Sequence, residues 1–167
     1  QAPLTLDYHV LLQLLDEIVL ASELRSTDGR RLDGTALGLG IASSANMLRT
    51  SDAPSKVIIL LTDGANNAGL DPIQATRAAA AFGIRIYTIG MGRPGLVEYP
   101  NSNGDIQTIE SDLDEDALRE IAQLSNGLYF RAEDSDGLQQ IYDQIDSLER
   151  SDAERVIFIR WRDQAAQ

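Results

Sequence analysis

The sequence predicts an α/β fold: a doubly wound, mostly parallel sheet with helices on both faces, lacking its first strands. Two short apolar runs, Val57–Leu61 and Ile84–Ile89, are typical of strands buried on both faces of a parallel sheet. Segments with helical periodicity separate and follow these runs, and such alternation forms right-handed βαβ units. With 167 residues, the chain is long enough for one domain with a sizeable core.

Composition limits the classes of partner. The chain has 14 Lys and Arg against 26 Asp and Glu, a net charge of −12, which argues against nucleic acid or an anionic membrane as a partner. It has no cysteine, which excludes disulfides and thiolate metal sites. No run approaches the roughly 18 apolar residues of a membrane span, so we expect no direct membrane insertion by this chain. Because the chain begins at Gln1 without a methionine or a signal-peptide pattern, we expect it to be an excerpt.

Two helices are predicted before the first strand. Apolar residues recur with helical spacing over Asp7–Leu20, and a second helix is predicted over Thr35–Arg49. The small residues of the second helix, including Gly38 and Gly40, suit close packing against a sheet. No strand precedes Val57–Leu61, so this predicted central strand has no partner on one side. Its free edge predicts possible self-association of the chain.

The elements after the first strand follow from their boundary signals. Asp71 and Pro72 predict the start of a helix, and Gly83 its end. Asn103–Gly104 favours a hairpin between Val97–Tyr99 and Ile106–Ile109. The remaining predicted elements are a helix that begins at Asp114, a strand over Leu128–Phe130, a helix over Ser135–Leu148 and a last strand over Val156–Trp161. Residues 1–150 are expected to form a partial domain, and residues 151–167 a C-terminal strand and tail.

Two polar residues are predicted to meet at one edge of the sheet. Ligands of open α/β sheets bind beyond the carboxyl ends of the strands, and Asp63 follows the first predicted strand. The helix before this strand starts at Gly34–Thr35, so Thr35 is expected at the same edge. A hydroxyl and a carboxylate are hard oxygen ligands suited to Mg²⁺ or Mn²⁺. The same spacing also allows a simpler interpretation, in which Thr35 only caps the helix and Asp63 only opens a turn.

Four segments carry a resemblance to a known family. They are residues 34–40 (GTALGLG), 57–69 (VIILLTDGANNAG), 86–92 (IYTIGMG) and 127–132 (GLYFRA). They resemble the von Willebrand factor type A (vWA) domain, and most closely bacterial Bat aerotolerance proteins and similar membrane-anchored proteins. The resemblance covers about residues 1–150, without the first three strands and the first helix of the family pattern.

The resemblance implies a metal-ion-dependent adhesion site. In that site a D-x-S-x-S loop joins a threonine and an aspartate from later loops, and an acidic residue of a protein partner completes the metal shell. Thr35 and Asp63 match the threonine and the aspartate, but no Asp of this sequence is followed two residues later by Ser. The metal site is therefore expected to be incomplete in this chain. The residues expected to line the partner-binding rim are Gly34, Gly64, Asn66 and Asn67.

The predicted function is metal-ion-dependent binding of a protein ligand, not catalysis. The resemblance places the chain in the bacterial cell envelope, as a soluble domain of a membrane-anchored parent on the periplasmic or extracytoplasmic side. Two alternatives stay open: a Mg²⁺-dependent, phosphatase-like enzyme that uses Asp63, and a metal-free structural scaffold. The single lysine, Lys56, argues against the enzyme, because it lies roughly 23 Å from Asp63 along an extended strand.

Overall fold

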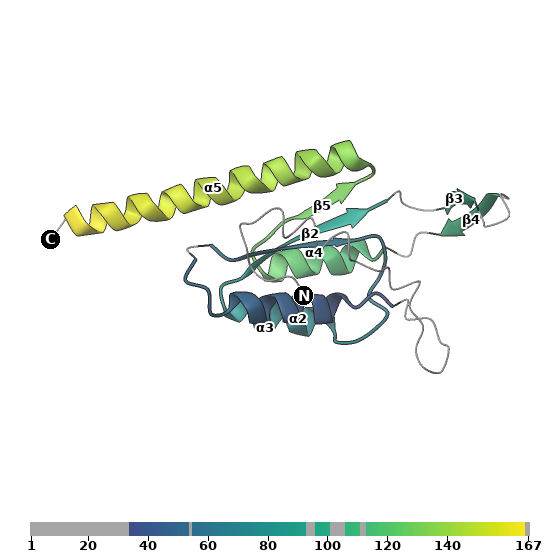
Figure 1. Cartoon of the computed structure of the whole chain (residues 1–167), viewed down its shortest axis with the longest axis horizontal. Helices are drawn as coiled ribbons and strands as arrows, with labels where there is room; N and C mark the ends of the chain where they lie inside the picture. Colours follow the sequence, from purple (N-terminus) through teal and green to yellow (C-terminus); the bar gives the residue numbers. More distant parts are fainter. Residues whose placement is uncertain (1–33, 54, 93–95, 101–105, 111–112, 166–167) are drawn as a thin grey trace, which may run out of the picture. The chain divides into compact units, whose positions relative to one another are not determined.

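The structure is a computed structural model that describes residues 34–165 apart from residues 54, 93–95, 101–105 and 111–112. The chain divides into two compact units, Gln1–Gly34 and Thr35–Gln167, and every element described below lies in the second unit. In chain order these elements are α2 (Leu37–Leu48), β1 (Val57–Thr62), α3 (Pro72–Ala81), β2 (Arg85–Met91), β3 (Leu96–Pro100), β4 (Ile106–Glu110), α4 (Glu115–Leu124), β5 (Tyr129–Ala132) and α5 (Ser135–Ala165) (Figure 1). The helix predicted over Asp7–Leu20 lies outside the described residues.

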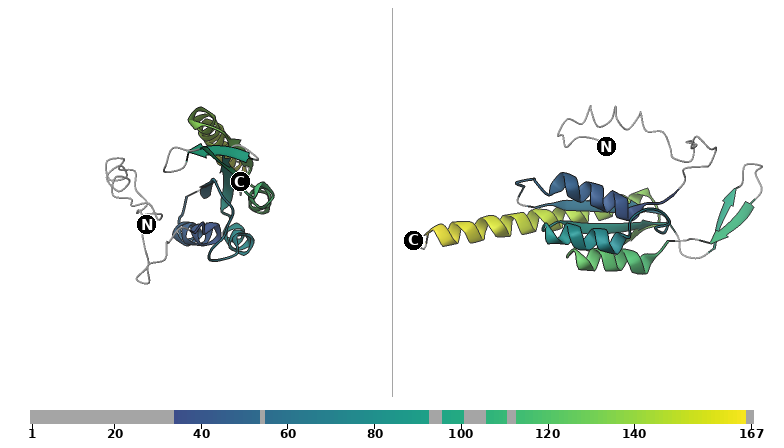
Figure 2. Two further views of the ribbon diagram at one scale, coloured as in Figure 1. Left: turned by 90° about the vertical axis from the view of Figure 1, so that its right-hand side faces the viewer. Right: turned by 90° about the horizontal axis from the view of Figure 1, so that it is seen from below.

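A parallel sheet in the order β1-β2-β5 forms the centre of the second unit. The helices α2, α3 and α4 lie side by side (Figure 2) and pack on one face of this sheet. Helix α5 packs on the other face through Ile141 and Ile145, which join Tyr87 and Ile89 of β2 in a second apolar cluster. The predicted α/β fold, with a parallel sheet and helices on both faces, is thus confirmed.

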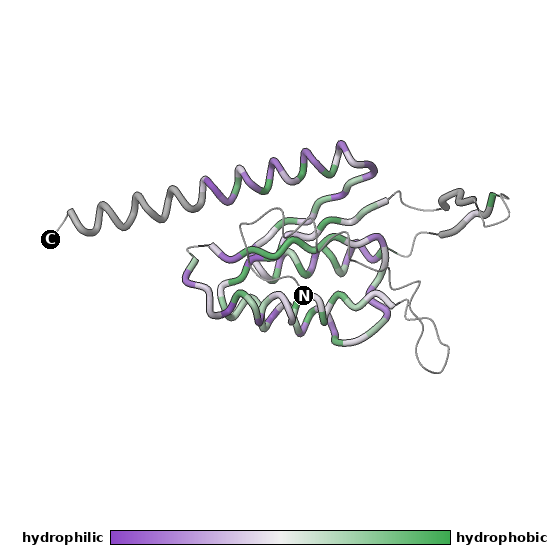
Figure 3. Tube along the Cα trace, viewed as in Figure 1, coloured by the Kyte–Doolittle hydropathy of each residue, from purple (hydrophilic) through white to green (hydrophobic). Residues whose placement is uncertain are grey.

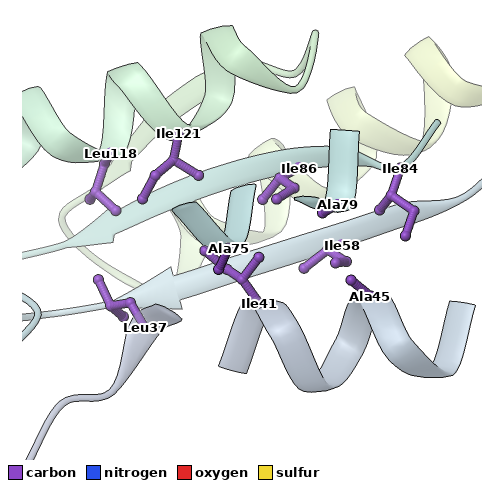
Figure 4. Close-up of a cluster of buried hydrophobic side chains, with 10 residues drawn as sticks. All are labelled: Leu37, Ile41, Ala45, Ile58, Ala75, Ala79, Ile84, Ile86, Leu118 and Ile121. Carbon is purple, nitrogen blue, oxygen red and sulfur yellow. The ribbon is translucent and has the colours of Figure 1, made fainter. Parts of the chain in front are cut away.

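Strand β2 supplies side chains to both faces of the sheet, because successive residues of a strand point in opposite directions. In Figure 3 the strands β1 and β2 are coloured mainly from white to green, the neutral to apolar part of the scale. Ile86 packs with Ile41 of α2 and with Leu118 and Ile121 of α4, all buried in one cluster (Figure 4). Thr88 is fully buried and donates to the backbone oxygen of Leu118 at 2.9 Å, so its hydroxyl is not left unsatisfied.

Strand β1 is an edge of the described sheet and is buried on one face only. Ile58 is buried against α2 and α3, whereas Ile59 and Leu61, which point to the opposite face, are 38% and 43% exposed. The prediction that this strand is buried on both faces is therefore wrong for the described part of the chain. The physical reason is that α5 covers this face of the sheet at β2 and β5, whereas no described helix packs over Ile59 and Leu61 of the edge strand.

The predicted boundary signals act as expected. The Asp71 carboxylate accepts from the backbone N–H of Ile73 at 2.8 Å and caps α3, and Asp114 caps α4 by accepting from Ala117 at 3.0 Å. The predicted hairpin forms as well, since β3 and β4 pair in antiparallel fashion. In the chain this hairpin lies between β2 and α4.

The last predicted strand is wrong. Residues Val156–Trp161 belong to α5, which runs without interruption for 31 residues. No glycine or proline follows Gly137 to end the helix, and the residues after Leu148 are mostly good helix formers, so adding residues to an existing helix outweighs the strand preference of a short β-branched run. Among the helices of the described residues, none is both long and apolar enough to cross a membrane.

Candidate functional site

Asp63 is presented at the carboxyl end of β1 by a fixed turn. The hydroxyl of Thr62, the last residue of β1, is buried and donates to the backbone oxygen of Gly64 at 2.9 Å. The same hydroxyl accepts from the N–H of Gly64 at 3.2 Å, so both backbone groups of Gly64 are held. Asp63 lies between these two residues and is exposed. Among the described residues, no side chain or backbone group forms a hydrogen bond or ion pair with its carboxylate.

Thr35 is attached to the loop that follows Asp63. Its backbone N–H donates to the Oδ1 atom of Asn67 at 2.7 Å. Its backbone oxygen accepts from the N–H groups of Asn67 and Ala68 at 3.0 and 3.2 Å. These bonds join residues that are 32 or 33 positions apart in the sequence. They bring Thr35, which is half-buried, to the loop that begins with Asp63.

The start of α2 is stabilised by that same loop and not by Thr35. The N-cap residue is Ala36, which has no side-chain capping bond. Instead the Oδ1 atom of Asn66 accepts from the N–H of Gly38 at 3.4 Å, a long bond to one of the free donors of the first turn. The interpretation of Thr35 as a simple helix cap is therefore wrong, because Ala36 occupies the N-cap position and Asn66 of the loop accepts from the first turn.

The four residues expected at the rim are placed differently from one another. Gly34 is exposed, whereas Gly64 is buried beneath the Asp63 turn. Asn66 is half-buried and Asn67 exposed, but the side-chain oxygens of both accept from the segment around the start of α2. The sequence analysis did not identify Thr62. A threonine at the end of a strand and before Asp-Gly is the signal that could have found it, since its hydroxyl can close such a turn.

Thr35 and Asp63 offer the type of ligand atom that a hard divalent ion prefers, but they offer only two such ligands. A hydroxyl and a carboxylate are oxygen donors, and Mg²⁺ is commonly held by one or two carboxylates while it keeps several waters. Within the described residues there is no group of three or more His, Cys, Asp or Glu side chains that could hold a metal ion. The two oxygens are therefore suited to weak binding of Mg²⁺ or Mn²⁺.

The amino end of the sheet carries a contrasting carboxylate. Glu149 of α5 accepts hydrogen bonds from Ser55 at 2.5 Å, from Tyr87 at 2.7 Å and from Arg85 at 2.7 Å. Burial raises the pKa of Glu149, but the three hydrogen bonds and the Arg85 charge outweigh it and hold the pKa below its ordinary value. The pKa of Tyr87 is raised, first by burial and then by its bond to Glu149. These contacts attach α5 to β2 and to Ser55, which lies two residues before β1.

The cationic groups of Lys56 and Arg131 are bound to groups other than Asp63. The ammonium group of Lys56 donates to the backbone oxygen of Arg49 at 3.3 Å, at the amino end of β1. Arg131 of β5 donates to the backbone oxygen of Gly92 from Nε at 3.1 Å and from a terminal nitrogen at 2.8 Å. It also forms an ion pair with Glu115. Both groups have backbone or carboxylate partners of their own.

Comparisons with known proteins agree with this architecture. The family model of the von Willebrand factor type A domain matches residues 12–144. A BatB protein of Bacteroides thetaiotaomicron has a similar structure, with a TM-score of 0.68, 28% identity and coverage of 90% of this chain and 73% of that one. An aerotolerance-related membrane protein of Bacteroides fragilis gives a TM-score of 0.64 and 25% identity, covering 86% and 71% of the two chains.

A membrane-spanning protein of Vibrio fischeri is 41% identical to this chain, with a TM-score of 0.50 and coverage of 89% of this chain and 70% of that one. Curated relatives are longer: the chain spans 35%, 37% and 39% of the length of three that it matches at 30% to 33% identity. The predicted resemblance to vWA domains and Bat proteins is thus confirmed. The chain belongs to the von Willebrand factor type A domain family.

Proposed function

We propose that this chain is a protein-binding module, and not an enzyme, that captures its partner at the carboxyl end of the sheet around Thr35 and Asp63. One observation carries the proposal. The Thr62 turn exposes the Asp63 carboxylate, while hydrogen bonds to the following loop hold Thr35 at the same edge. An exposed charge held by a buried, fully bonded turn is suited to recognition of a ligand.

A divalent ion bound at the carboxyl end of the sheet would make the module selective for partners that present an acidic residue. Thr35 and Asp63 would hold Mg²⁺ or Mn²⁺, and the ion would supply the positive charge that an acidic residue of the partner needs. With only these two oxygens among the described residues, we expect affinity for Mg²⁺ alone to be roughly millimolar or weaker. Water and the partner would fill the remaining positions of the shell.

The proposed location is the bacterial envelope. The Vibrio and Bacteroides relatives include a membrane-spanning protein and an aerotolerance-related membrane protein. By extension, this chain would be a domain of a membrane-anchored protein that meets its partner on the periplasmic or extracytoplasmic side.

Capture of envelope proteins on the immobilised chain tests the proposal. The wild-type chain should retain envelope proteins in Mg²⁺ and release them in EDTA. Chains with Asp63→Ala or Thr35→Ala should not retain these proteins in Mg²⁺. Asp52→Ala and Thr50→Ala are matched controls, because both residues are exposed and lie between α2 and the amino end of β1, away from Asp63. These two variants should capture normally.

Two outcomes would contradict the proposal. Capture that is indifferent to EDTA and unchanged in Asp63→Ala would instead support a metal-free scaffold. Hydrolysis of p-nitrophenyl phosphate in Mg²⁺ that disappears in Asp63→Ala would support the phosphatase-like alternative. The partners that Lys56 and Arg131 already have argue against that second outcome.

A further inference from the structure

We infer that Asn67 is the positioning residue of this site, which holds Thr35 in place on the loop that carries Asp63. The inference rests on the proposed function, because positioning Thr35 matters only if Thr35 and Asp63 bind together. It assigns to Asn67 an indirect role: the side chain acts on the ligand through Thr35 and does not itself contact the ligand.

The backbone N–H and the backbone oxygen of Thr35 both form hydrogen bonds with this loop. The N–H of Thr35 donates to Oδ1 of Asn67 at 2.7 Å, and its oxygen accepts from the N–H groups of Asn67 and Ala68 at 3.0 and 3.2 Å. Thr35 precedes α2 by two residues, and the first intrahelical acceptor is the oxygen of Ala36, so the helix does not fix Thr35. Without the loop, the segment before α2 would be free to pivot.

The loop itself is fixed at its other end. Thr62 holds both backbone groups of Gly64 through one buried hydroxyl. Only three residues, from Gly64 to Asn66, separate Asp63 from Asn67. The relative position of the two candidate ligands is therefore set by one short loop, clamped by Thr62 on one side and by Asn67 on the other. Such prior ordering of side chains increases the affinity of a site that has few ligands.

The hydrogen bond defines which side chains can replace Asn67. A backbone N–H is a donor, so the atom that faces it must be the acceptor Oδ1 and not the amide nitrogen. Aspartate keeps an acceptor at that place, whereas alanine removes it. Comparison of Asn67→Asp with Asn67→Ala thus distinguishes the effect of losing the hydrogen bond from the effect of changing the side chain at this position. Asn46→Ala is a matched control, because Asn46 is an exposed asparagine at the far end of α2 that accepts from Arg49 at 2.9 Å.

Amide hydrogen exchange measures the clamp directly. By ¹⁵N NMR, the Thr35 amide should exchange slowly in the wild-type chain, in Asn67→Asp and in Asn46→Ala. In Asn67→Ala it should exchange at least about tenfold faster, while the amides of β2 keep their rates, because only local opening is affected. Equal Thr35 exchange in Asn67→Ala and wild type would overturn the inference.

Titration with Mn²⁺, followed by paramagnetic broadening of the same spectra, tests the functional consequence. Asn67→Ala should weaken Mn²⁺ binding about tenfold, as removal of a residue that orients a ligand usually does. In the Thr35→Ala background the same substitution should cause no further loss, because Asn67 acts through Thr35. If Asn67→Ala instead acted by a general loss of structure, its effect on Mn²⁺ affinity would add to that of Thr35→Ala. In Asn67→Asp the hydrogen bond to the Thr35 N–H should remain, and with it the position of Thr35.

The remaining outcomes separate the two ideas. If Thr35→Ala and Asp63→Ala weaken Mn²⁺ binding while Asn67→Ala does not, the positioning role is wrong and the proposed function stands. If neither Thr35→Ala nor Asp63→Ala changes Mn²⁺ binding, the proposed metal site is wrong, and the functional role of Asn67 is wrong with it.

Discussion

Glu149 and Asp63 are carboxylates at opposite ends of the same sheet, and their surroundings differ in almost every respect. Glu149 is 17% exposed in its side chain and accepts from a serine, a tyrosine and an arginine. Asp63 is exposed and has no hydrogen-bond donor among the described residues. The amino end thus uses its carboxylate to join α5 to the sheet, whereas the carboxyl end leaves one available.

The difference contrasts a carboxylate that stabilises the fold with one that the fold leaves available to a ligand. A carboxylate that accepts from three donors contributes to the stability of the fold and has few acceptor positions left for a ligand. An exposed one contributes little to stability and can be substituted at little cost. At the carboxyl end the order lies in the backbone beneath the carboxylate, where Thr62 and Asn67 hold the loop.

The largest expected effect tests how tightly that backbone is packed. A Cβ atom on Gly38 would lie 2.0 Å from the backbone oxygen of Leu70, so α2 or the loop must move. We expect Gly38→Ala to lower the free energy of unfolding by about 3 kcal/mol. Gly40→Ala is the control, since its Cβ would meet nothing within 4 Å. It should stabilise α2 by about 1 kcal/mol in urea denaturation. Equal effects of the two would show that the carboxyl end is loosely packed.

A smaller effect concerns the amino end and its dependence on pH. Because the folded-state pKa of Glu149 lies below its ordinary value near 4.5, its contribution is full above that pH and is lost as the pH falls through the folded pKa. Glu149→Gln should lower stability by about 1.5 kcal/mol at pH 7. It should also reduce the loss of stability below pH 4.5 in denaturation curves recorded at several pH values. An unchanged acid limb would contradict the assignment of Glu149 as the anchor of α5.

The smallest expected effect on stability is that of Asp63. Asp63→Ala should change the free energy of unfolding by no more than about 0.5 kcal/mol, because the side chain is exposed and the turn is closed by Thr62. The same variant should abolish the Mn²⁺-dependent broadening of amides in residues 63–68. A marked loss of stability would show that Asp63 is a structural carboxylate like Glu149, and the contrast between the two ends would fail.

Most of the fold could be predicted because its signals are local. Asp71 with Pro72, and Asp114, mark helix starts through bonds to residues two or three positions away. The two errors have different causes. Whether Val57–Leu61 is buried on one face or on both depends on distant elements that pack over it. The strand predicted over Val156–Trp161 failed for a local reason, because no residue ends the helix that begins at Ser135 and the β-branched run is short.

Of the candidate site, the sequence predicts only the side chains whose oxygen atoms could bind a ligand directly. Thr35 and Asp63 follow from the rule that ligands bind beyond the carboxyl ends of parallel strands. The roles of Asn66 and Asn67 do not, because each depends on a bond to a residue about 30 positions earlier in the sequence. An asparagine next to a motif predicts a polar rim. Only the structure shows that both side-chain oxygens accept from backbone N–H groups at the start of α2.

The anchor at Glu149 also bears on the order in which the domain assembles. Its three bonds join residues 62, 64 and 94 positions apart, whereas each βαβ unit closes within a much shorter stretch of chain. Long loops close at a greater entropic cost, so contacts of this kind tend to form late, after the folding transition state. Weakening them should then leave the folding rate nearly unchanged and speed unfolding. The lifetime of the native state would accordingly depend on how long α5 stays attached to the sheet.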